Sequence, residues 1–432
     1  MKTYSQIVVH DGNKSLIDIL DISVLSTFTG NPIHVHAEGL RGTGKTTIMR
    51  AYKSILPFIE RIKGCEFNCD PRAPHCPEHK NLNMEEINKI GVEKIRMPFV
   101  EISASAKKGT VVGSIDLEKL TSKDDPRAAL LLGTIPKANR GILFIDEINR
   151  IADISPEIAD ILLDVMGTKP GRIQIEEVGL PTIEIPVNVT VWAASNPDEE
   201  PGPLEDVRKQ LSDRFDFVVY VDKPHGAEVV KSILEGKIKD NGLSEILKKN
   251  LYIDSQKRIE KFQVPEEIKD ALALCYVNFN LESIRGLESV INGLKMLSAL
   301  YDRDVNPKDV TFLARYALKH RTSEKNVFEI IKFIENTLTM NRVKRDEAEV
   351  AYFQKNKAEE SEKINKKIAG NNKSIIFDRF KFLRWPFLSK KYKTMGSNHN
   401  PVGVEIKAPP QKAKNIDEIG EEELIKTEEE LK

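Results

Sequence analysis

The chain has 432 residues, of which 40% are hydrophobic and 30% charged, so it is long enough for two or three domains with buried cores. Its 65 basic and 66 acidic residues leave a formal charge of −1, which argues against binding of nucleic acid through bulk positive charge. No apolar run reaches the roughly 18–20 residues of a membrane span, and the first residues lack the apolar core of a signal peptide. We therefore expect a cytoplasmic protein without integral membrane association.

Short apolar runs rich in β-branched residues alternate with longer helical stretches from about residue 30 to residue 222. This alternation predicts an α/β domain built on a parallel sheet. Thr110–Ile115 and Arg172–Ile185 are expected to form hairpins, because a glycine interrupts short apolar runs in each. The predicted strands are Pro32–Ala37, Phe99–Ile102, Ile142–Ile145, Val189–Ala194 and Phe217–Val221.

The strand pattern stops after Pro224 and gives way to helical periodicity. Leu281–Tyr301 repeats apolar residues at helical spacing, and Asn306-Pro307 is a typical helix start for Lys308–His320. From about residue 346 the chain is rich in both charges and poor in apolar residues, which is typical of disorder. The predicted domains are a nucleotide-binding α/β domain over 1–224, a helical domain over 225–345 and a charged, partly disordered extension over 346–432.

A complete phosphate-loop (Walker A) pattern, GxxxxGK[ST], lies between the first predicted strand and the next helix. Its glycines let successive backbone N–H groups turn toward a phosphate, and the start of the following helix adds a positive dipole. Lys45 is expected at the β- and γ-phosphates of ATP, and the Thr46 hydroxyl on Mg²⁺. The predicted nucleotide-binding residues of this segment are Gly39, Arg41, Gly42, Thr43, Gly44, Lys45, Thr46 and Thr47.

Two later strands end in side chains that would complete such a site. The apolar run GILFI is followed by Asp146 and Glu147 (a Walker B pattern). Asp146 is expected to hold Mg²⁺ together with Thr46, and Glu147 to polarise a water toward the γ-phosphate. Asn196 follows another strand and is expected to help hold that water, although an Asn-Pro turn would also explain its presence.

Three arginines suggest that the site is shared between subunits. Arg214 precedes the last predicted strand, and Arg208 lies six residues earlier as a second candidate. We expect Arg214 to reach the nucleotide of a neighbouring subunit, where it would stabilise charge in the transition state. Arg285 opens an amphipathic helix and is expected to fold over the nucleotide. Surface ion pairing is the alternative for all three.

Several segments together resemble one known family. GLRGTGKTT, GILFIDEINRI, AASNPDE, KQLSDRFDF and SIRGLESVINGLKMLSALYDRDV are similar to the ATPase (I) subunit of magnesium chelatase, within the AAA+ superfamily, and the resemblance covers about residues 3–322. It implies an AAA+ P-loop core with a five-stranded parallel sheet and hairpin inserts, followed by an α-helical lid. It also implies a hexameric ring that hydrolyses ATP at its interfaces, with Arg214 from the neighbour and Arg285 in the lid. The run Arg208–Ser212 departs from the family's usual Arg-Pro-Gln-Leu-Leu.

The resemblance implies a partner as well. Such rings act on a protein with a von Willebrand A domain, or on a further chelatase subunit, and a true chelatase inserts a metal ion into a porphyrin. A MoxR-like chaperone ATPase, which matures a partner protein without chelation, is the alternative. A nucleic-acid translocase is the second alternative, against which the neutral net charge argues.

Three cysteines and a histidine form a C-x3-C-x6-C-x2-H pattern at Cys65, Cys69, Cys76 and His79. Thiolates and an imidazole in this number suit tetrahedral Zn²⁺, with His75 as a competing ligand. A stiff loop with unpaired thiols and an iron–sulfur cluster are the alternatives. Cys275 lies in the apolar run ALALCYVNF and is expected to be a small core residue.

The extension contains one segment of unusual composition. Ile375–Met395 combines six basic residues with one acidic residue and six aromatic ones. This mixture suits docking on a partner protein, packing back on the ring, or contact with lipid or nucleic acid.

Overall fold

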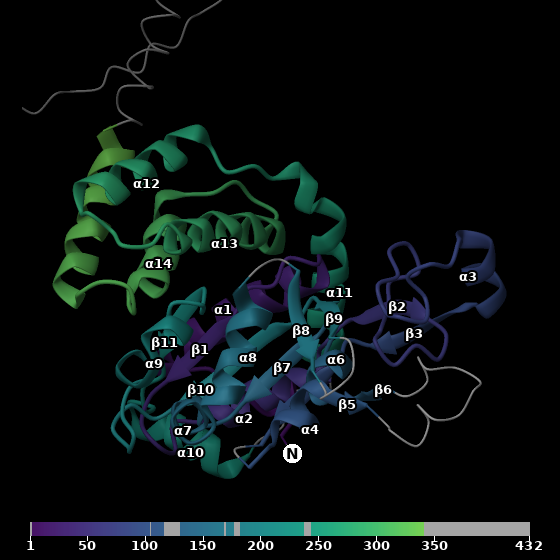
Figure 1. Ribbon diagram of the computed structural model, residues 1–432. Helices are drawn as coiled ribbons and strands as arrows, with labels where there is room; N and C mark the ends of the chain where they lie inside the picture. Colours follow the sequence, from purple (N-terminus) through teal and green to yellow (C-terminus); the bar gives the residue numbers. More distant parts are fainter. Residues whose placement is uncertain are drawn as a thin grey trace, which may run out of the picture. The chain divides into compact units, whose positions relative to one another are not determined.

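Five parallel strands form the central sheet, in the order β11-β1-β10-β7-β4 (Figure 1). Each overlaps one of the five predicted runs, so the prediction of a parallel α/β sheet is confirmed. Strands β1, β7 and β10 are buried along their whole length, as expected of a parallel sheet covered on both faces. The five strands are β1 (Val35–Glu38), β4 (Phe99–Ile102), β7 (Ile142–Ile145), β10 (Thr190–Ser195) and β11 (Phe217–Tyr220).

The computed structural model describes residues 2–103, 105–115, 130–167, 170–176, 182–236 and 243–340. The predictions for the extension over 346–432, including Ile375–Met395, lie outside these ranges. Within them, no helix is long and apolar enough to cross a membrane.

Successive side chains of the strands enter two different cores, because neighbouring residues of a strand point to opposite faces. On one face, Phe144 and Trp192 pack with residues of α1 and α2. On the other face, Leu143 and Val191 pack with residues of three helices that follow the sheet strands. The first face is covered by α1 (Asp11–Phe28) and α2 (Lys45–Ala51), and the second by α7 (Ile148–Ile154), α8 (Pro156–Gly167) and α9 (Leu204–Ser212).

The chain beyond β11 is helical, as its periodicity predicts. Asn306 caps α14 by accepting a hydrogen bond from the backbone N–H of Asp309, with Pro307 in the first turn. Helix α14 contacts both α13 and β11, and α11 contacts α1. The division at residue 224 stays a prediction. The helices are α10 (Ala227–Glu235), α11 (Leu243–Arg258), α12 (Glu266–Asn278), α13 (Arg285–Tyr301), α14 (Pro307–Leu318) and a last one over 324–340.

One of the two predicted hairpins is present and the other is wrong. Strands β8 (Gly171–Ile175) and β9 (Ile183–Val187) pair antiparallel. Thr110–Ile115 is instead the end of α4 (Lys108–Val112) followed by β5 (Gly113–Ile115), which pairs with β6 (Leu130–Leu132). Gly113 does not turn between two strands: its φ is +116°, and a Cβ there would lie 2.5 Å from the backbone oxygen of Leu131. The glycine is therefore needed for the close approach of β6.

The sequence did not predict the hairpin that carries the cysteine-rich loop. Strands β2 (Phe58–Ile62) and β3 (Val92–Arg96) pair antiparallel, and the loop and α3 (Met84–Ile90) lie between them. Every other residue of β3 is exposed, so its charged side chains hide the strand in a search for apolar runs. Further along the chain, after β6, a short helix, α6 (Thr134–Lys137), precedes β7.

Candidate functional site

The phosphate loop connects the end of β1 to the start of α2, as its sequence predicts. Gly39, Gly42 and Gly44 have φ values of +146°, +82° and +88°, a backbone region that residues other than glycine rarely adopt. A Cβ at Gly39 would also lie 2.3 Å from the backbone oxygen of Val221. These glycines give the loop a curvature that aims backbone N–H groups inward.

Lys45 is held inside this curve. Its ammonium group donates to the backbone oxygens of Gly39 at 2.5 Å and Leu40 at 2.8 Å, and the residue is only 8% exposed. Burial lowers the pKa of Lys45, and the carboxylates of Asp146 and Glu199 act in the opposite direction. Thr43 is buried as well and donates its hydroxyl to the oxygen of Leu40.

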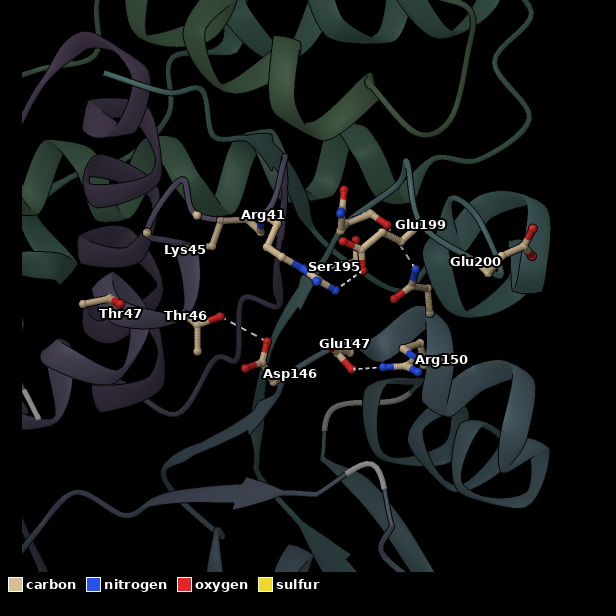
Figure 2. A pocket seen from close by; sticks show the side chains of 14 residues that line it. Arg41, Lys45, Thr46, Thr47, Asp146, Glu147, Arg150, Ser195, Glu199 and Glu200 are labelled. Atoms are coloured by element: carbon tan, nitrogen blue, oxygen red, sulfur yellow. Dashed lines mark hydrogen bonds and ion pairs between the residues drawn. The ribbon is translucent and has the colours of Figure 1, made fainter. Parts of the chain in front are cut away.

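The structure brings the phosphate loop together with the tip of β7. The hydroxyl of Thr46 donates to a carboxylate oxygen of Asp146 at 3.1 Å (Figure 2). Arg50, one turn further along α2, lies 3.5 Å from the other oxygen of Asp146 and 3.0 Å from Glu101. A hydroxyl and a carboxylate this close, with a cationic side chain beside them, suit a divalent cation and its phosphate ligands.

Glu147 follows directly and has a left-handed backbone, with φ of +53° and ψ of +49°. Its carboxylate pairs with the guanidinium of Arg150 at 2.8 Å (Figure 2). Sequence reasoning missed Arg150, although its position three residues after Glu147, at the start of α7, was a usable signal. The predicted catalytic carboxylate is therefore engaged in an ion pair in this structure.

One cavity of about 280 Å³ joins most of the predicted nucleotide site. Arg41 pairs with Glu199 at 2.8 Å across it. The amide oxygen of Asn196 accepts a hydrogen bond from the backbone N–H of Asp198, which is the turn geometry expected of Asn-Pro. The predicted residues lining the cavity are Arg41, Gly42, Gly44, Lys45, Thr46, Thr47, Asp146, Glu147 and Asn196, and those not predicted are Asn149, Arg150, Ser195, Glu199 and Glu200.

The three arginines predicted to act between subunits or in the lid, Arg208, Arg214 and Arg285, do not line this cavity. Arg208 interrupts the helical geometry of α9 and pairs with Asp160 on α8. Arg214 lies beside the end of α8, where its guanidinium would be 3.0 Å from a Cβ on Gly167. Burial and the neighbouring charge of Arg285 lower the pKa of Arg214.

Asp213, next to Arg214, joins the sheet to the helical region. It accepts from Arg285 at 2.9 Å and from Arg321 at 3.0 Å. Arg321 also donates to the backbone oxygens of Asp213 and Phe215. Arg321 was not predicted, because it follows α14 in a short basic run without a recognisable motif. Together these contacts place Arg285 against α9 rather than over the phosphate loop.

The four residues of the cysteine pattern also lie close together. Cys65, Cys69, Cys76 and His79 are buried, and their potential ligand atoms all lie within 4.8 Å of one another. Cys275 is buried in α12, as expected of a core residue.

No family model matches the chain. The chain is 31% identical over 300 residues to the magnesium-chelatase 38 kDa subunit of Acidiphilium rubrum, a match that covers 66% of this chain and 83% of that protein. It belongs to the family of magnesium chelatase I subunits, in the AAA+ superfamily.

Two further members show how widely the family extends. The magnesium-chelatase 38 kDa subunit of Rhodobacter capsulatus is 30% identical over 300 residues, covering 66% of this chain and 79% of that protein. A homologue of magnesium-chelatase subunit ChlI from Methanocaldococcus jannaschii is 28% identical over 298 residues, with 66% and 78% covered. Among solved structures, a model of the complex between BchI and BchD of magnesium chelatase matches with 27% identity and a TM-score of 0.42, over 77% of this chain and 99% of that one.

A buried histidine contacts the lining of the cavity in this magnesium chelatase I-subunit relative. His36 on β1 is fully buried, and its Nε2 lies 2.8 Å from the hydroxyl of Ser195, which lines the cavity. Burial lowers the pKa of His36 to about 4, below the value of about 6.5 for an unfolded histidine. The folded protein therefore holds this ring neutral at physiological pH.

This shift predicts a loss of stability in acid. Below about pH 6.5 the unfolded chain takes up a proton at His36 that the folded chain refuses until about pH 4, so the free energy of unfolding falls as the pH falls through this window. At about 1.4 kcal/mol per pKa unit, the loss from His36 approaches about 3 kcal/mol. Urea unfolding of His36→Gln between pH 7 and pH 4 should show a weaker pH dependence than the wild type. The matched control is His225→Gln at an exposed histidine, and equal pH dependence of His36→Gln and wild type would contradict the account.

Proposed function

We propose that this chain is the ATP-hydrolysing motor subunit of a ring, with one nucleotide site per subunit. The observation that carries the proposal is the 3.1 Å hydrogen bond between Thr46 on the phosphate loop and Asp146 at the tip of β7. It joins the two motifs of a P-loop ATPase at one edge of the cavity, with Glu147 as the next residue. Membership of the magnesium chelatase I-subunit family agrees with this chemistry.

The residues present fit a nucleoside triphosphate with Mg²⁺. Three glycines with positive φ shape a loop whose N–H groups suit phosphate oxygens, and the buried ammonium group of Lys45 already lies against that loop. Thr46 and Asp146 would hold the metal ion, which neutralises charge on the phosphates when bound. Lys45 would bind the β- and γ-phosphates in exchange for the backbone oxygens of Gly39 and Leu40.

Glu147 is the proposed general base. It would orient the attacking water and accept its proton, and Asn196, on the same cavity, would help position that water. Because the guanidinium of Arg150 forms an ion pair with the carboxylate of Glu147 at 2.8 Å, Glu147 can act as a base only after this ion pair has opened. Arg150 is exposed by about half, so the opening costs little free energy.

In the proposed ring, a neighbouring subunit supplies the arginine that the nucleotide site of each chain lacks. Arg214 and Arg285 lie outside the cavity of their own chain, and Arg214 is next to Asp213, which fixes its backbone through Arg285 and Arg321. We assign Arg214 to the transition state of the neighbouring subunit's nucleotide, with Arg208, six residues earlier on α9, as the second candidate. Arg285 would sense the nucleotide through its bond to Asp213. A hexamer is the proposed assembly.

The proposed client is a protein with a von Willebrand A domain or a further chelatase subunit. The relatives are named as subunits of a magnesium chelatase, so a partner is part of the proposal. Metal insertion into a porphyrin follows only if that partner carries the porphyrin site.

Two substitutions test the hydrolytic site separately. Lys45→Ala should abolish nucleotide binding, because a phosphate ligand is lost from the loop. Glu147→Gln should bind ATP as the wild type does but hydrolyse it about 100-fold more slowly or worse, since only proton transfer is lost. Nucleotide affinity and phosphate release are the measurements, and Glu157→Gln on the exposed start of α8 is the control. Retained affinity in Lys45→Ala, or normal turnover in Glu147→Gln, would contradict the assignment.

The partner proposal predicts a coupled rate. Adding a purified chelatase subunit with a von Willebrand A domain should change the rate of ATP hydrolysis several-fold in the wild type and leave Glu147→Gln inactive. Absorption of an added porphyrin reports metal insertion and separates chelation from chaperone activity. An unchanged rate together with no complex in analytical ultracentrifugation would reject this class of partner.

A further inference from the structure

Four potential metal ligands meet in the loop between β2 and β3. The sulfur of Cys76 lies 4.0 Å from that of Cys65 and 3.0 Å from Nδ1 of His79, and no two of the four ligand atoms, with Cys69 included, are more than 4.8 Å apart. With metal–sulfur bonds of about 2.3 Å, neighbouring corners of a tetrahedron around zinc lie about 3.8 Å apart. The four atoms are therefore spaced for a single tetrahedral ion.

This spacing decides between the alternatives raised by the sequence. An iron–sulfur cluster places several iron ions and bridging sulfides between its cysteine ligands, and ligand atoms within 4.8 Å of one another leave no room for them. The three thiols are free of disulfides. A hydrogen bond between a thiol and an imidazole would explain the 3.0 Å contact of Cys76 with His79, but it gives no reason for three sulfurs and this nitrogen all to lie within 4.8 Å of one another.

Two backbone N–H groups point at the sulfur of Cys69. Its sulfur accepts hydrogen bonds from the backbone N–H groups of His75 at 3.4 Å and Cys76 at 3.3 Å. Bonds of this kind orient metal ligands and offset their negative charge. Arg140 and Arg61 add positive charge, and Arg61 donates to the backbone oxygen of Cys65. A site with three thiolates and zinc carries one net negative charge, and the two arginines lie near it, each also paired with a carboxylate, Arg140 with Asp70 and Arg61 with Glu93.

The hydrogen-bond network also selects His79 over His75 as the fourth ligand. The amide oxygen of Asn139 accepts from the backbone N–H of Asn188 at 2.7 Å, so its nitrogen faces Nε2 of His75 at 3.2 Å as a donor. Nε2 must then accept, and the proton of the neutral ring lies on Nδ1. That Nδ1–H points to the sulfur of Cys69 at 3.3 Å. His75 thus supports a ligand and is not one itself.

The same loop is tied to the chain that leads into β7. Asn68 donates to the backbone oxygen of Lys137 at 3.0 Å, and Asn139 donates to that of Phe67 at 2.8 Å. Arg140 binds the backbone oxygen of Glu60 at 2.6 Å and pairs with Asp70 at 3.1 Å. The contacts with Phe67, Asn68 and Asp70 need the loop in its observed conformation. Asp146 directly follows β7.

We propose that Cys65, Cys69, Cys76 and His79 bind one structural Zn²⁺ ion, which fixes the loop against the segment preceding β7. The three thiols lose their protons to solvent as the ion binds, and no redox step is involved. The ion is distinct from the Mg²⁺ proposed at the nucleotide site, so zinc binding stands or falls independently of ATP hydrolysis.

Metal analysis of the purified full-length protein tests the proposal. We expect about one zinc per chain, lost in Cys65→Ser/Cys69→Ser and retained in Cys275→Ser, the matched control at the buried cysteine of α12. His79→Gln should lower zinc affinity strongly, whereas His75→Gln should keep the stoichiometry. Iron with acid-labile sulfide, or wild-type protein that takes up no stoichiometric zinc after reduction and incubation with it, would overturn the proposal.

A second measurement needs only the wild-type protein and so does not depend on folding of the variants. Replacement of zinc by Co²⁺ should give the intense visible absorption of a tetrahedral thiolate site. Removal of the metal by a chelator should speed tryptic cleavage at the exposed residues Arg72 and Lys80, and added Zn²⁺ should reverse it. An absorption spectrum of octahedral Co²⁺, or cleavage that does not respond to the metal, would contradict a structural tetrahedral site.

Discussion

The register of three parallel strands determines where the chemistry of this protein lies. Glu38, the last residue of β1, is paired with Ser195 at the end of β10, and β10 pairs with β7 so that Ala193 lies beside Ile145. Because the strands are parallel and in step, the phosphate loop, Asn196 and Asp146 all emerge at one edge of the sheet. The hydrogen bond from Thr46 to Asp146 is a consequence of that register. A slip by one residue would turn each of these side chains to the wrong face.

Polar and charged contacts tie the helical region to both edges of the sheet, Asp213 and Asp216 lying where β11 begins and Glu38 where β1 ends. Asp213 accepts from Arg285 and Arg321, Ser289 donates to Asp216 at 2.7 Å, and Lys319 pairs with the buried Glu38. Removal of one member of such a pair leaves a buried charge without its partner, which is more costly than loss of a surface ion pair. Lys319 therefore contacts the edge that carries the phosphate loop, whereas Asp213, the neighbour of Arg214, lies at the opposite edge, before β11 begins.

Features encoded by local pattern were predictable from the sequence, and features that depend on distant contacts were not. Three of the five sheet strands are buried along their whole length, and the glycines of the phosphate loop sit in a motif of fixed spacing. The β2–β3 hairpin was missed because the exposed, charged residues of β3 mask its alternation. The hairpin expected within Thr110–Ile115 was wrong because the partner of β5 is β6, which begins only at Leu130. The pairing of Glu147 with Arg150 and the choice of His79 over His75 both required the three-dimensional network, in which Asn139 fixes the ring of His75.

Mixing of variant subunits tests most directly whether Arg214 of one subunit completes the nucleotide site of the next, as we propose. Lys45→Ala and Arg214→Ala are each expected to be inactive alone. In a random mixture, about a quarter of the head-to-tail interfaces join an intact phosphate loop to an intact Arg214, so ATP hydrolysis should return. A mixture of Lys45→Ala with Glu147→Gln is the control, because both changes fall in the same half-site and mixing restores no complete site. Recovery only in the first mixture is the predicted result, and no recovery there, in rings shown to exchange subunits, would contradict the shared site.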